Sequence, residues 1–409
     1  MKKQTFEYAS LLAAGAVAAM SLSACGGGGG GGSASTPAPA TTSGTVRVAL
    51  TDAPACGFDA VNVTVTKVRV NASAGAGDTD AGWTDITLNP ARKINLLNLT
   101  NGVLDTLGQT SLPAGHYSQV RLVLDANTGG GLANSVVPTG GTEQALMSPS
   151  ASQSGLKLTH EFDVAAGQTA DLVLDFDACK SVVTQGQGHY LLKPVIKVVP
   201  NIATGITGVI APAQLGGHVT VSAQQRGIIV ASTTPNATTG EFALTHLAAG
   251  DYDVVVTADN SAADVIGAVP VTASANTVLS TSAAPLTLAA AFTGTIRGTV
   301  TLPAGATEQA YVSASQTIAG GPAVVVRFAG VDLGSGAYRI DNLPVAAPQY
   351  AVYSATLPLK FAAATTVQPQ VGSYRVQATG TGYAGSGQTA LGVPVTAGLP
   401  TTADFVLGQ

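Results

Sequence analysis

The chain has 409 residues, which predicts two or three domains, and 10% of them are charged against 45% hydrophobic. Its 49 Gly and 21 Pro are typical of short strands joined by turns, and the low charge argues against long amphipathic helices. The net charge of -5 leaves no basic patch to displace counterions, so we expect no nucleic-acid partner.

The first 24 residues have the organisation of an export signal. Lys2 and Lys3 precede the apolar run ASLLAAGAVAAM, which is too short to span a bilayer, where about 20 apolar residues are needed. The LSAC stretch at 22–25 resembles the lipobox of bacterial lipoproteins, which implies cleavage before Cys25 and acylation of that residue. The alternative is an ordinary secreted protein with a chance cysteine near the cleavage site.

Residues 25–43 begin with Cys25 and seven glycines and continue with Ser, Ala, Thr and Pro only. This composition cannot bury a core and predicts a flexible tether. Two or more acyl chains hold a protein stably at a membrane. We therefore expect a lipid-anchored protein of the cell envelope with the membrane as a partner, and by resemblance to lipoprotein sorting Gly26 indicates the outer membrane, facing the periplasm or the surface.

Two cysteines remain after Cys25. Cys56 and Cys179 form an even pair in a protein with an export signal, which predicts one disulfide. Two buried free thiols are the alternative.

Alternating strands dominate residues 44–200, and we expect a two-layer β-sandwich. In VNVTVTKVRV the apolar parity switches near Thr66, which predicts a β-bulge or a strand passing between layers. INLLNLTNG at 94–102 fits a short helical turn or an edge strand. A loop-rich insertion is expected from Asn127 to Ser154. The predicted inward side chains of three later strands are Val120, Leu122, Leu124, Phe162, Val164, Leu172, Leu174 and Phe176.

The remaining residues contain a weak internal repeat. GITGVI in the first copy corresponds to GTIRGTV in the second, and GHVTVSAQ corresponds to AYVSASQ. Each copy ends with VPVTA. Two further β-sandwiches at 204–290 and 292–409 fit this spacing, with an extra segment from Tyr350 to Val371 in the second copy. The predicted fold class is therefore all-β, with tandem antiparallel β-sandwich domains after a signal peptide and tether.

Two family resemblances follow from these motifs. The order LTDAP, VNVTVTKVRV, LPAGHYSQVRLVLD, LVLDFDACKSV, YLLKPVIKVV resembles bacterial lipoproteins with domain of unknown function 4382, which implies no activity. The G-x-[VI] openings and G-x-Tyr-x-Val hairpins of the later copies are similar to carboxypeptidase-regulatory or transthyretin-like sandwiches. These belong to a carbohydrate-binding-like fold group, so the resemblance implies sugar binding by analogy of fold alone.

Paired acids suggest one candidate metal site. Asp175 and Asp177 lie two apart on one strand, so both project from one face, with Asp171 further along it. Asp52 or Asp59 could join them in the fold as a further ligand for calcium. Solvent-facing acids on an amphipathic strand are the alternative, and no EF-hand-type loop is present. We expect no resident cofactor beyond this calcium.

Catalytic signatures are missing from the sequence. The five histidines lack metal-ligand spacing, and HEFDV has Val164 where a zincin motif needs its second histidine. No nucleophile elbow or Walker loop occurs. We therefore expect a protein without enzymatic activity.

The expected function is a lipid-anchored structural or binding module. The alternative is a carbohydrate-binding surface lipoprotein, in which Trp83, in the loop DTDAGWTDI, and tyrosines of the later copies would stack on sugar rings. In the structural alternative these aromatic rings are half-buried packing residues. The expected partner beyond the membrane is an unidentified protein or glycan.

Overall fold

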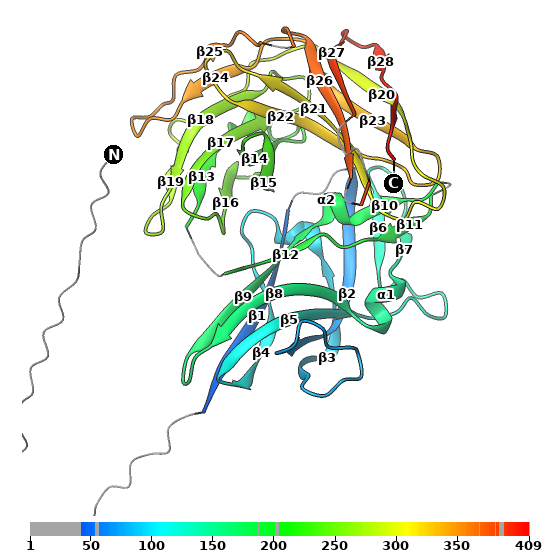
Figure 1. Ribbon diagram of the computed structural model, residues 1–409. Helices are drawn as coiled ribbons and strands as arrows, with labels where there is room; N and C mark the ends of the chain where they lie inside the picture. The colour runs from blue at the N-terminus through cyan, green and yellow to red at the C-terminus, as the bar shows by residue number, and fades with distance from the viewer. Residues whose placement is uncertain are drawn as a thin grey trace, which may run out of the picture. The chain divides into compact units, whose positions relative to one another are not determined.

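The computed structural model describes residues 42–53, 57–186, 188–200, 204–367, 369–380, 382–383 and 388–408. The signal peptide, Cys25 and all but the last two residues of the predicted tether lie outside this set. Nearly every described element is a strand, which confirms the all-β fold class (Figure 1). Within the described residues no helix has both the length and the apolar character needed to cross a membrane. Residues Thr41–Gln409 form one compact unit.

Two sheets enclose a first hydrophobic core, built from residues between Val46 and Leu192. The four-stranded sheet has the order β12 (Ile196–Pro200), β9 (Thr169–Asp177), β1 (Ser43–Ala53), β4 (Asp105–Pro113). The eight-stranded sheet has the order β10 (Val182–Thr184), β11 (Tyr190–Leu192), β7 (Gln144–Met147), β6 (Ser135–Pro138), β2 (Phe58–Asn71), β5 (Gly115–Leu124), β8 (Leu156–Val164), and β3 (Thr84–Asn95) pairs with β2. Short helical turns are η1 (Leu96–Leu99), α1 (Pro149–Gln153) and α2 (Ala178–Ser181).

Several predictions for this part are confirmed. All eight inward side chains expected from the alternation are buried. The parity switch in β2 is a bulge, because its pairing with both β3 and β5 shifts register between Val65 and Lys67. Of the two alternatives for residues 94–102, the helical turn is present as η1.

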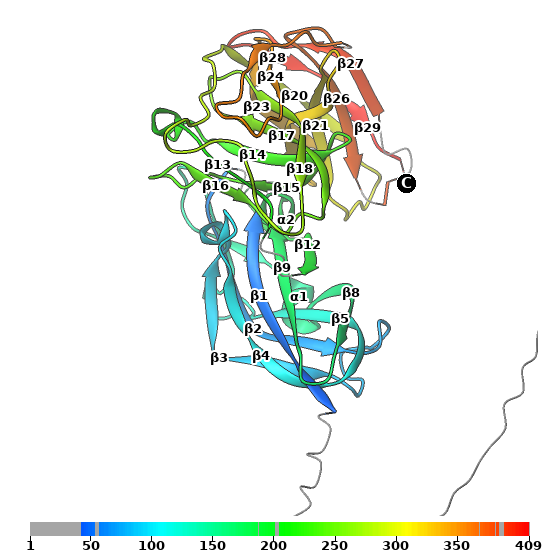
Figure 2. The ribbon, with the colours of Figure 1, turned by 90° about the vertical axis from the view of Figure 1, so that its left-hand side faces the viewer.

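Two features differ from the expectation. β1 pairs in parallel with β9, although the sheets were expected to be antiparallel, and Figure 2 shows the two strands side by side. The insertion from Asn127 to Ser154 holds β6, β7 and α1. β6 pairs with β2, so this segment extends the larger sheet.

A second core is built from residues between Ile206 and Leu288. Its smaller sheet has the order β16 (Glu241–Leu244), β13 (Ile206–Val209), β19 (Thr277–Val278). Its larger sheet has the order β15 (Ile228–Thr233), β14 (Thr220–Gln225), β17 (Gly250–Thr257), β18 (Asp264–Val271), β24 (Gln349–Val352), β25 (Ala362–Ala363). The turn η2 spans Pro212–Gln214.

A third core is built mainly from residues between Ile296 and Leu407. One sheet has the order β23 (Ala337–Pro344), β20 (Thr293–Thr301), β28 (Pro400–Thr402), and β29 (Phe405–Val406) also pairs with β20. The other has the order β22 (Ala323–Gly330), β21 (Ala310–Thr317), β26 (Ser373–Gly380), β27 (Gln388–Pro394). Three large cores accompany the three predicted domains, while the domain boundaries stay predictions. A small fourth cluster joins Val255 and Val265 of the second part to Ile318 and Val324 of the third.

The extra segment of the second repeat copy lies on the sheet of the first copy. Its strand β24 pairs in parallel with β18, and its side chains Tyr353, Leu359 and Phe361 pack against the second core. The chain thus leaves the third core after β23, extends the neighbouring sheet, and returns at β26.

A tyrosine hydroxyl closes the same corner in each of the three cores. The hydroxyl of Tyr117 donates to the carbonyl of Pro113 at 3.0 Å, and that of Tyr252 donates to Ala248 at 2.9 Å. Tyr374 donates to Pro344 at 2.7 Å, across the extra segment. The motifs LPAGHY and LAAGDY carry this corner, which is a known fastening of β-sandwiches.

Candidate functional site

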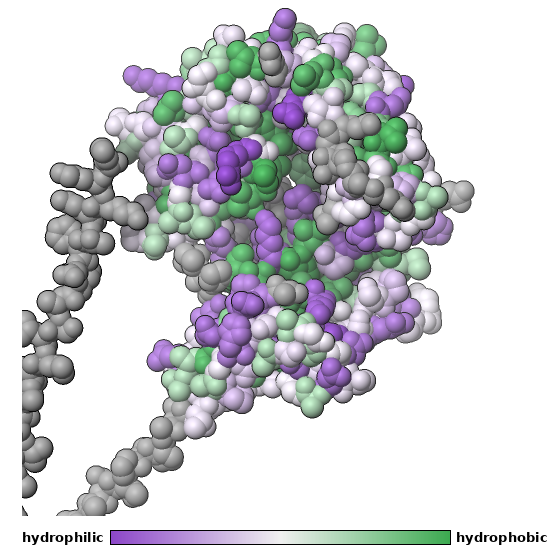
Figure 3. Space-filling model, in the orientation of Figure 1, coloured by the Kyte–Doolittle hydropathy of each residue, from purple (hydrophilic) through white to green (hydrophobic). Residues whose placement is uncertain are grey.

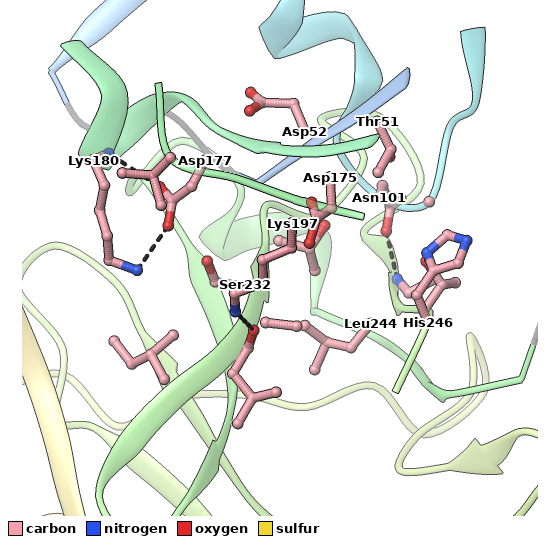
Figure 4. Close-up of a pocket in the computed structure, with 18 residues that line it drawn as sticks. Thr51, Asp52, Asn101, Asp175, Asp177, Lys180, Lys197, Ser232, Leu244 and His246 are labelled. Atoms are coloured by element: carbon pink, nitrogen blue, oxygen red, sulfur yellow. Dashed lines mark hydrogen bonds and ion pairs between the residues drawn. The ribbon is translucent and has the colours of Figure 1, made fainter. Parts of the chain in front are cut away.

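A polar cleft lies where the four-stranded sheet of the first core meets strands of the second (Figure 4). On its floor Lys197 of β12, Asp175 of β9 and Thr51 of β1 form one row across the sheet, because Lys197 and Thr51 are both register partners of Asp175. Asp177 follows two residues later on the same face, as the sequence predicted. The cleft therefore collects two carboxylates from β9, an ammonium from β12 and a hydroxyl from β1.

The opposite wall consists of residues 229–233 of β15 and residues 243–246 at the end of β16. The ammonium of Lys197 crosses the cleft and donates to the backbone carbonyl of Val230 at 3.0 Å. Asn101 binds β16 with both ends of its amide, donating to the carbonyl of Glu241 at 2.9 Å and accepting from the backbone N–H of Ala243. Lys197 and Asn101 thus bond to backbone groups of β15 and β16, so side chains rather than paired strands join the two cores here.

Burial controls the electrostatics of the cleft. It raises the pKa of Asp175 to about 6, an effect that the nearby Lys197 opposes. Burial also lowers the pKa of His246, so the neutral imidazole is favoured. Asp177 instead caps α2, accepting from the backbone N–H of Lys180 at 3.0 Å and from its ammonium at 2.7 Å.

The volume open to small molecules in this cleft is about 40 Å³. This space admits water molecules. Its polar floor offers these waters hydrogen-bond partners. A cavity of this size suits hydration of a junction and is far too small for a sugar ring.

The expected calcium ligands are only partly brought together. Asp175 and Asp177 share a face, but Asp52 is the register partner of Phe176 and therefore projects from the other face of the sheet, where its Oδ1 accepts from the backbone N–H of Ala178 at 3.0 Å. The calcium set therefore stays a prediction, since a strand's sequence gives parity within the strand and not between strands. Among the residues described, no cluster of three or more His, Cys, Asp or Glu side chains could hold a metal ion.

Trp83 is partly buried and already has partners. Its indole N–H donates to the carbonyl of Gly77 at 2.8 Å, and the guanidinium groups of Arg69 and Arg121 each lie 4.8 Å from the centre of the ring system. Cation–π contacts of this kind occupy the ring surface that a sugar would need. Trp83 thus packs against side chains of β2 and β5, and ligand binding by its ring stays a prediction.

Tyrosines of the later copies mostly face inward. Tyr374 is fully buried, and Tyr338 and Tyr383 are buried to within a tenth of their surface. The hydroxyl of Tyr311 donates to the backbone carbonyl of Lys180 at 2.6 Å. These contacts match the packing alternative for the tyrosine side chains.

Cys179 lies in α2, directly after β9. Cys56 lies outside the described residues, so its pairing with Cys179 stays a prediction. Sequence analysis missed Asn101, Lys197 and His246 as members of the cleft. Each is a lone polar residue whose position depends on contacts between distant segments, and no local motif marks it.

Comparisons with known proteins support the first resemblance. Residues 43–194 match a family described as "Domain of unknown function (DUF4382)", which confirms the expected N-terminal domain. No curated protein sequence matches the chain.

Solved structures with some similarity include proteins of three bacteria. The Bacillus anthracis TIE protein is 11% identical with a TM-score of 0.18, and the match covers 90% of this chain and 51% of that one, so the chain spans about half of its length. GBS52, the minor pilin of Streptococcus agalactiae, is 12% identical over 53% of this chain and 89% of that one, with a TM-score of 0.16. The major pilin SpaA of Corynebacterium diphtheriae is 13% identical over 90% and 100%, with a TM-score of 0.19. TM-scores of this size do not establish a shared fold.

Proposed function

We propose that this protein is a non-enzymatic structural or binding module of the cell envelope, a stiff three-core β body held at a membrane by an acylated Cys25 and a glycine-rich tether. The observation that carries the proposal is that each core is hydrogen-bonded to both of the others. Such a body keeps a fixed spacing between its ends, which is what a spacer or a presenting module needs.

Support for stiffness comes from specific side-chain bonds at each junction. Asn101 joins the first core to β16 of the second. Between the first and third cores, the backbone N–H of Gly186 donates to the Asp332 carboxylate at 2.9 Å, and Tyr311 binds the carbonyl of Lys180. The second and third cores share the β18–β24 pairing, and Gln224 adds a further bond to Val325. Independent domains on flexible linkers lack such bonds.

Support for the anchor comes from the sequence alone. The LSAC stretch before the glycines fits acylation at Cys25, and a tether of about 20 residues gives a root-mean-square reach of roughly 25 Å. The body would then stand away from the bilayer surface. Lipoprotein sorting would decide which membrane carries the protein, and Gly26 favours the outer membrane.

Limited digestion of the membrane fraction with elastase, which cuts after small residues, tests both parts of the proposal. We expect a single resistant fragment, beginning between residues 26 and 43 and reaching the C-terminal region, to be released from the membrane. Release of separate fragments for each core would contradict a stiff body. Failure of the intact chain to sediment with membranes before digestion would contradict the anchor.

Cysteine variants provide the matched control. Cys25→Ala should leave an uncleaved precursor or a soluble protein, whereas Cys56→Ala should still sediment with membranes. Equal membrane extraction of wild type and Cys25→Ala would overturn the lipid anchor.

A further inference from the structure

The loop between η1 and β4 contains the one Asn-Gly pair of the sequence, Asn101-Gly102. Both residues have a positive φ, 65° at Asn101 and 75° at Gly102, and the backbone N–H of Val103 donates to the carbonyl of Thr100 at 3.4 Å. These features define a tight turn of type I′. Asn101 and Gly102 are both partly exposed, so water reaches the turn.

The second position of this turn requires glycine. A Cβ added to Gly102 would lie 3.0 Å from Cγ2 of Thr245 in the second core, and residues with side chains rarely adopt a φ of 75°. The close approach of the turn to the second core therefore places a residue without a side chain directly after Asn101.

An asparagine followed by glycine reacts with its own backbone, because no side chain shields the glycine nitrogen, and asparagine is counted among the thermolabile residues. The backbone nitrogen of Gly102 bonds to Cγ of Asn101, the Cγ–Nδ2 bond breaks, and Nδ2 leaves as ammonia with the proton of the Gly102 N–H. Water then opens the cyclic imide at either of its carbonyls. The products are aspartate, or isoaspartate with the main chain running through Cγ.

The junction between the first two cores holds the Asn101 amide in place. Nδ2 donates to the carbonyl of Glu241 at 2.9 Å, and Oδ1 accepts from the backbone N–H of Ala243. The reaction expels Nδ2, so its bond to Glu241 must break. The closed junction therefore protects Asn101, and local opening of the junction allows the reaction.

The modified residue no longer fits the closed junction. Aspartate has an oxygen in place of Nδ2, so it faces the Glu241 carbonyl without a proton to donate. Its negative charge also joins Asp175 and Asp177, which line the same cleft. Isoaspartate in addition lengthens the main chain of the turn by one carbon. Both products therefore favour the open junction.

We infer that Asn101 modifies itself by loss of ammonia when the junction between the first and second cores opens, and that the modification then keeps the junction open. The reaction needs only water and this chain. The inference goes beyond the proposed function and does not depend on the lipid anchor.

Mass spectrometry of the full chain, incubated at pH 8 and then digested with trypsin, tests the inference. The tryptic peptide of residues 94–121 contains Asn101 together with Asn95 and Asn98, which serve as internal references. In the folded wild type, Asn101 should gain one dalton at least about tenfold more slowly than in urea. Lys197→Ala removes the bond from Lys197 to Val230 across the same junction and should raise the rate in the folded chain about fivefold.

Lys157→Ala is the matched control, because Lys157 is exposed and belongs to β8, outside the residues that line the cleft. It should react at the wild-type rate. Equal rates in Lys197→Ala and Lys157→Ala would overturn the inference, and so would an Asn101 that reacts as fast in the folded chain as in urea.

Asn101→Asp tests the consequence, because it places one product at the site from the start. It should melt about 2 °C lower than Asn98→Asp, which adds the same charge at an exposed position of η1. Equal melting temperatures of the two variants would overturn the effect on the junction.

Discussion

The side-chain amide of Gln224 and the backbone of Val325 are joined by two hydrogen bonds. Nε2 of Gln224 donates to the Val325 carbonyl at 2.7 Å, and its Oε1 accepts from the Val325 N–H at 2.9 Å. Gln224 belongs to β14 of the second core and is fully buried, whereas Val325 belongs to β22 of the third. The amide of Gln224 thus makes the two hydrogen bonds to Val325 that a neighbouring strand would otherwise make.

Gln224→Ala should destabilise the protein by about 2 to 3 kcal/mol, because it leaves an N–H and a carbonyl of β22 without partners in a buried junction. The measurement is urea denaturation. Gln225→Ala is the control, since Gln225 is partly exposed and its Nε2 donates to the carbonyl of Asp251 at 3.1 Å. Equal effects of the two substitutions would contradict the importance of the Gln224 bonds.

Tyr374→Phe should lower the free energy of unfolding by about 1 to 2 kcal/mol, because it removes the hydroxyl that closes the third corner onto Pro344 and leaves a buried carbonyl unpaired. Tyr117→Phe and Tyr252→Phe should act in the same way on their cores. Tyr353→Phe is the comparison, since that ring packs on the second core and no hydrogen bond of its hydroxyl occurs among the described residues. A corner variant that unfolds at the wild-type urea concentration would refute this assignment.

Asp264 makes stability depend on pH. Within the described part of the chain, neither of its two buried carboxylate oxygens has a hydrogen-bond partner, and burial raises its pKa to about 7 from 3.8. The folded state therefore favours the protonated form. The stability that this proton provides is complete below about pH 4 and is lost as the pH rises through about 7.

Asp264→Asn should remove this dependence. At pH 8 the variant should be more stable than wild type by up to about 4 kcal/mol, since each pKa unit corresponds to about 1.4 kcal/mol, and at pH 4 the two should be nearly equal. Urea midpoints at both pH values provide the measurement, with the exposed Asp251→Asn as control. Asp175 shifts in the same direction and remains in both proteins, so the difference isolates Asp264. A variant less stable than wild type at pH 8 would contradict this account.

The predicted disulfide between Cys56 and Cys179 should leave no free thiol at these positions in the unreduced, denatured protein, and reductant should release two. Closing a loop of about 124 residues would stabilise the fold by roughly 5 kcal/mol in the chain-entropy picture. Thiol titration of Cys25→Ala isolates this pair. Two reactive thiols before reduction would refute the prediction.

Local patterns predicted what depends on neighbours in the sequence. Parity along a strand identified Val120, Leu122 and Leu124 as buried, and its interruption near Thr66 located a bulge. The repeat comparison found the extra segment after Tyr350. It did not show that this segment pairs with β18, because strand partners are chosen by tertiary packing that no local motif records.

The candidate site was less accessible to sequence reasoning. The shared face of Asp175 and Asp177 follows from their spacing, but the register that brings Lys197 beside Asp175 and turns Asp52 away joins segments far apart in the chain. The tyrosine corners left a visible signal, L-x-A-G-x-Y at 112–117 and 247–252, and the first of these was not connected to the later repeat. In the third core the extra segment separates Pro344 from Tyr374 and hides the motif.

The three cores should unfold as one stiff body. Differential scanning calorimetry of the full chain measures this, because cooperative unfolding gives a calorimetric enthalpy equal to the van't Hoff enthalpy. We expect one transition for wild type, with a ratio of about 1 between these enthalpies. Two or three resolved transitions in the wild-type protein, each with the enthalpy of a single core, would contradict it.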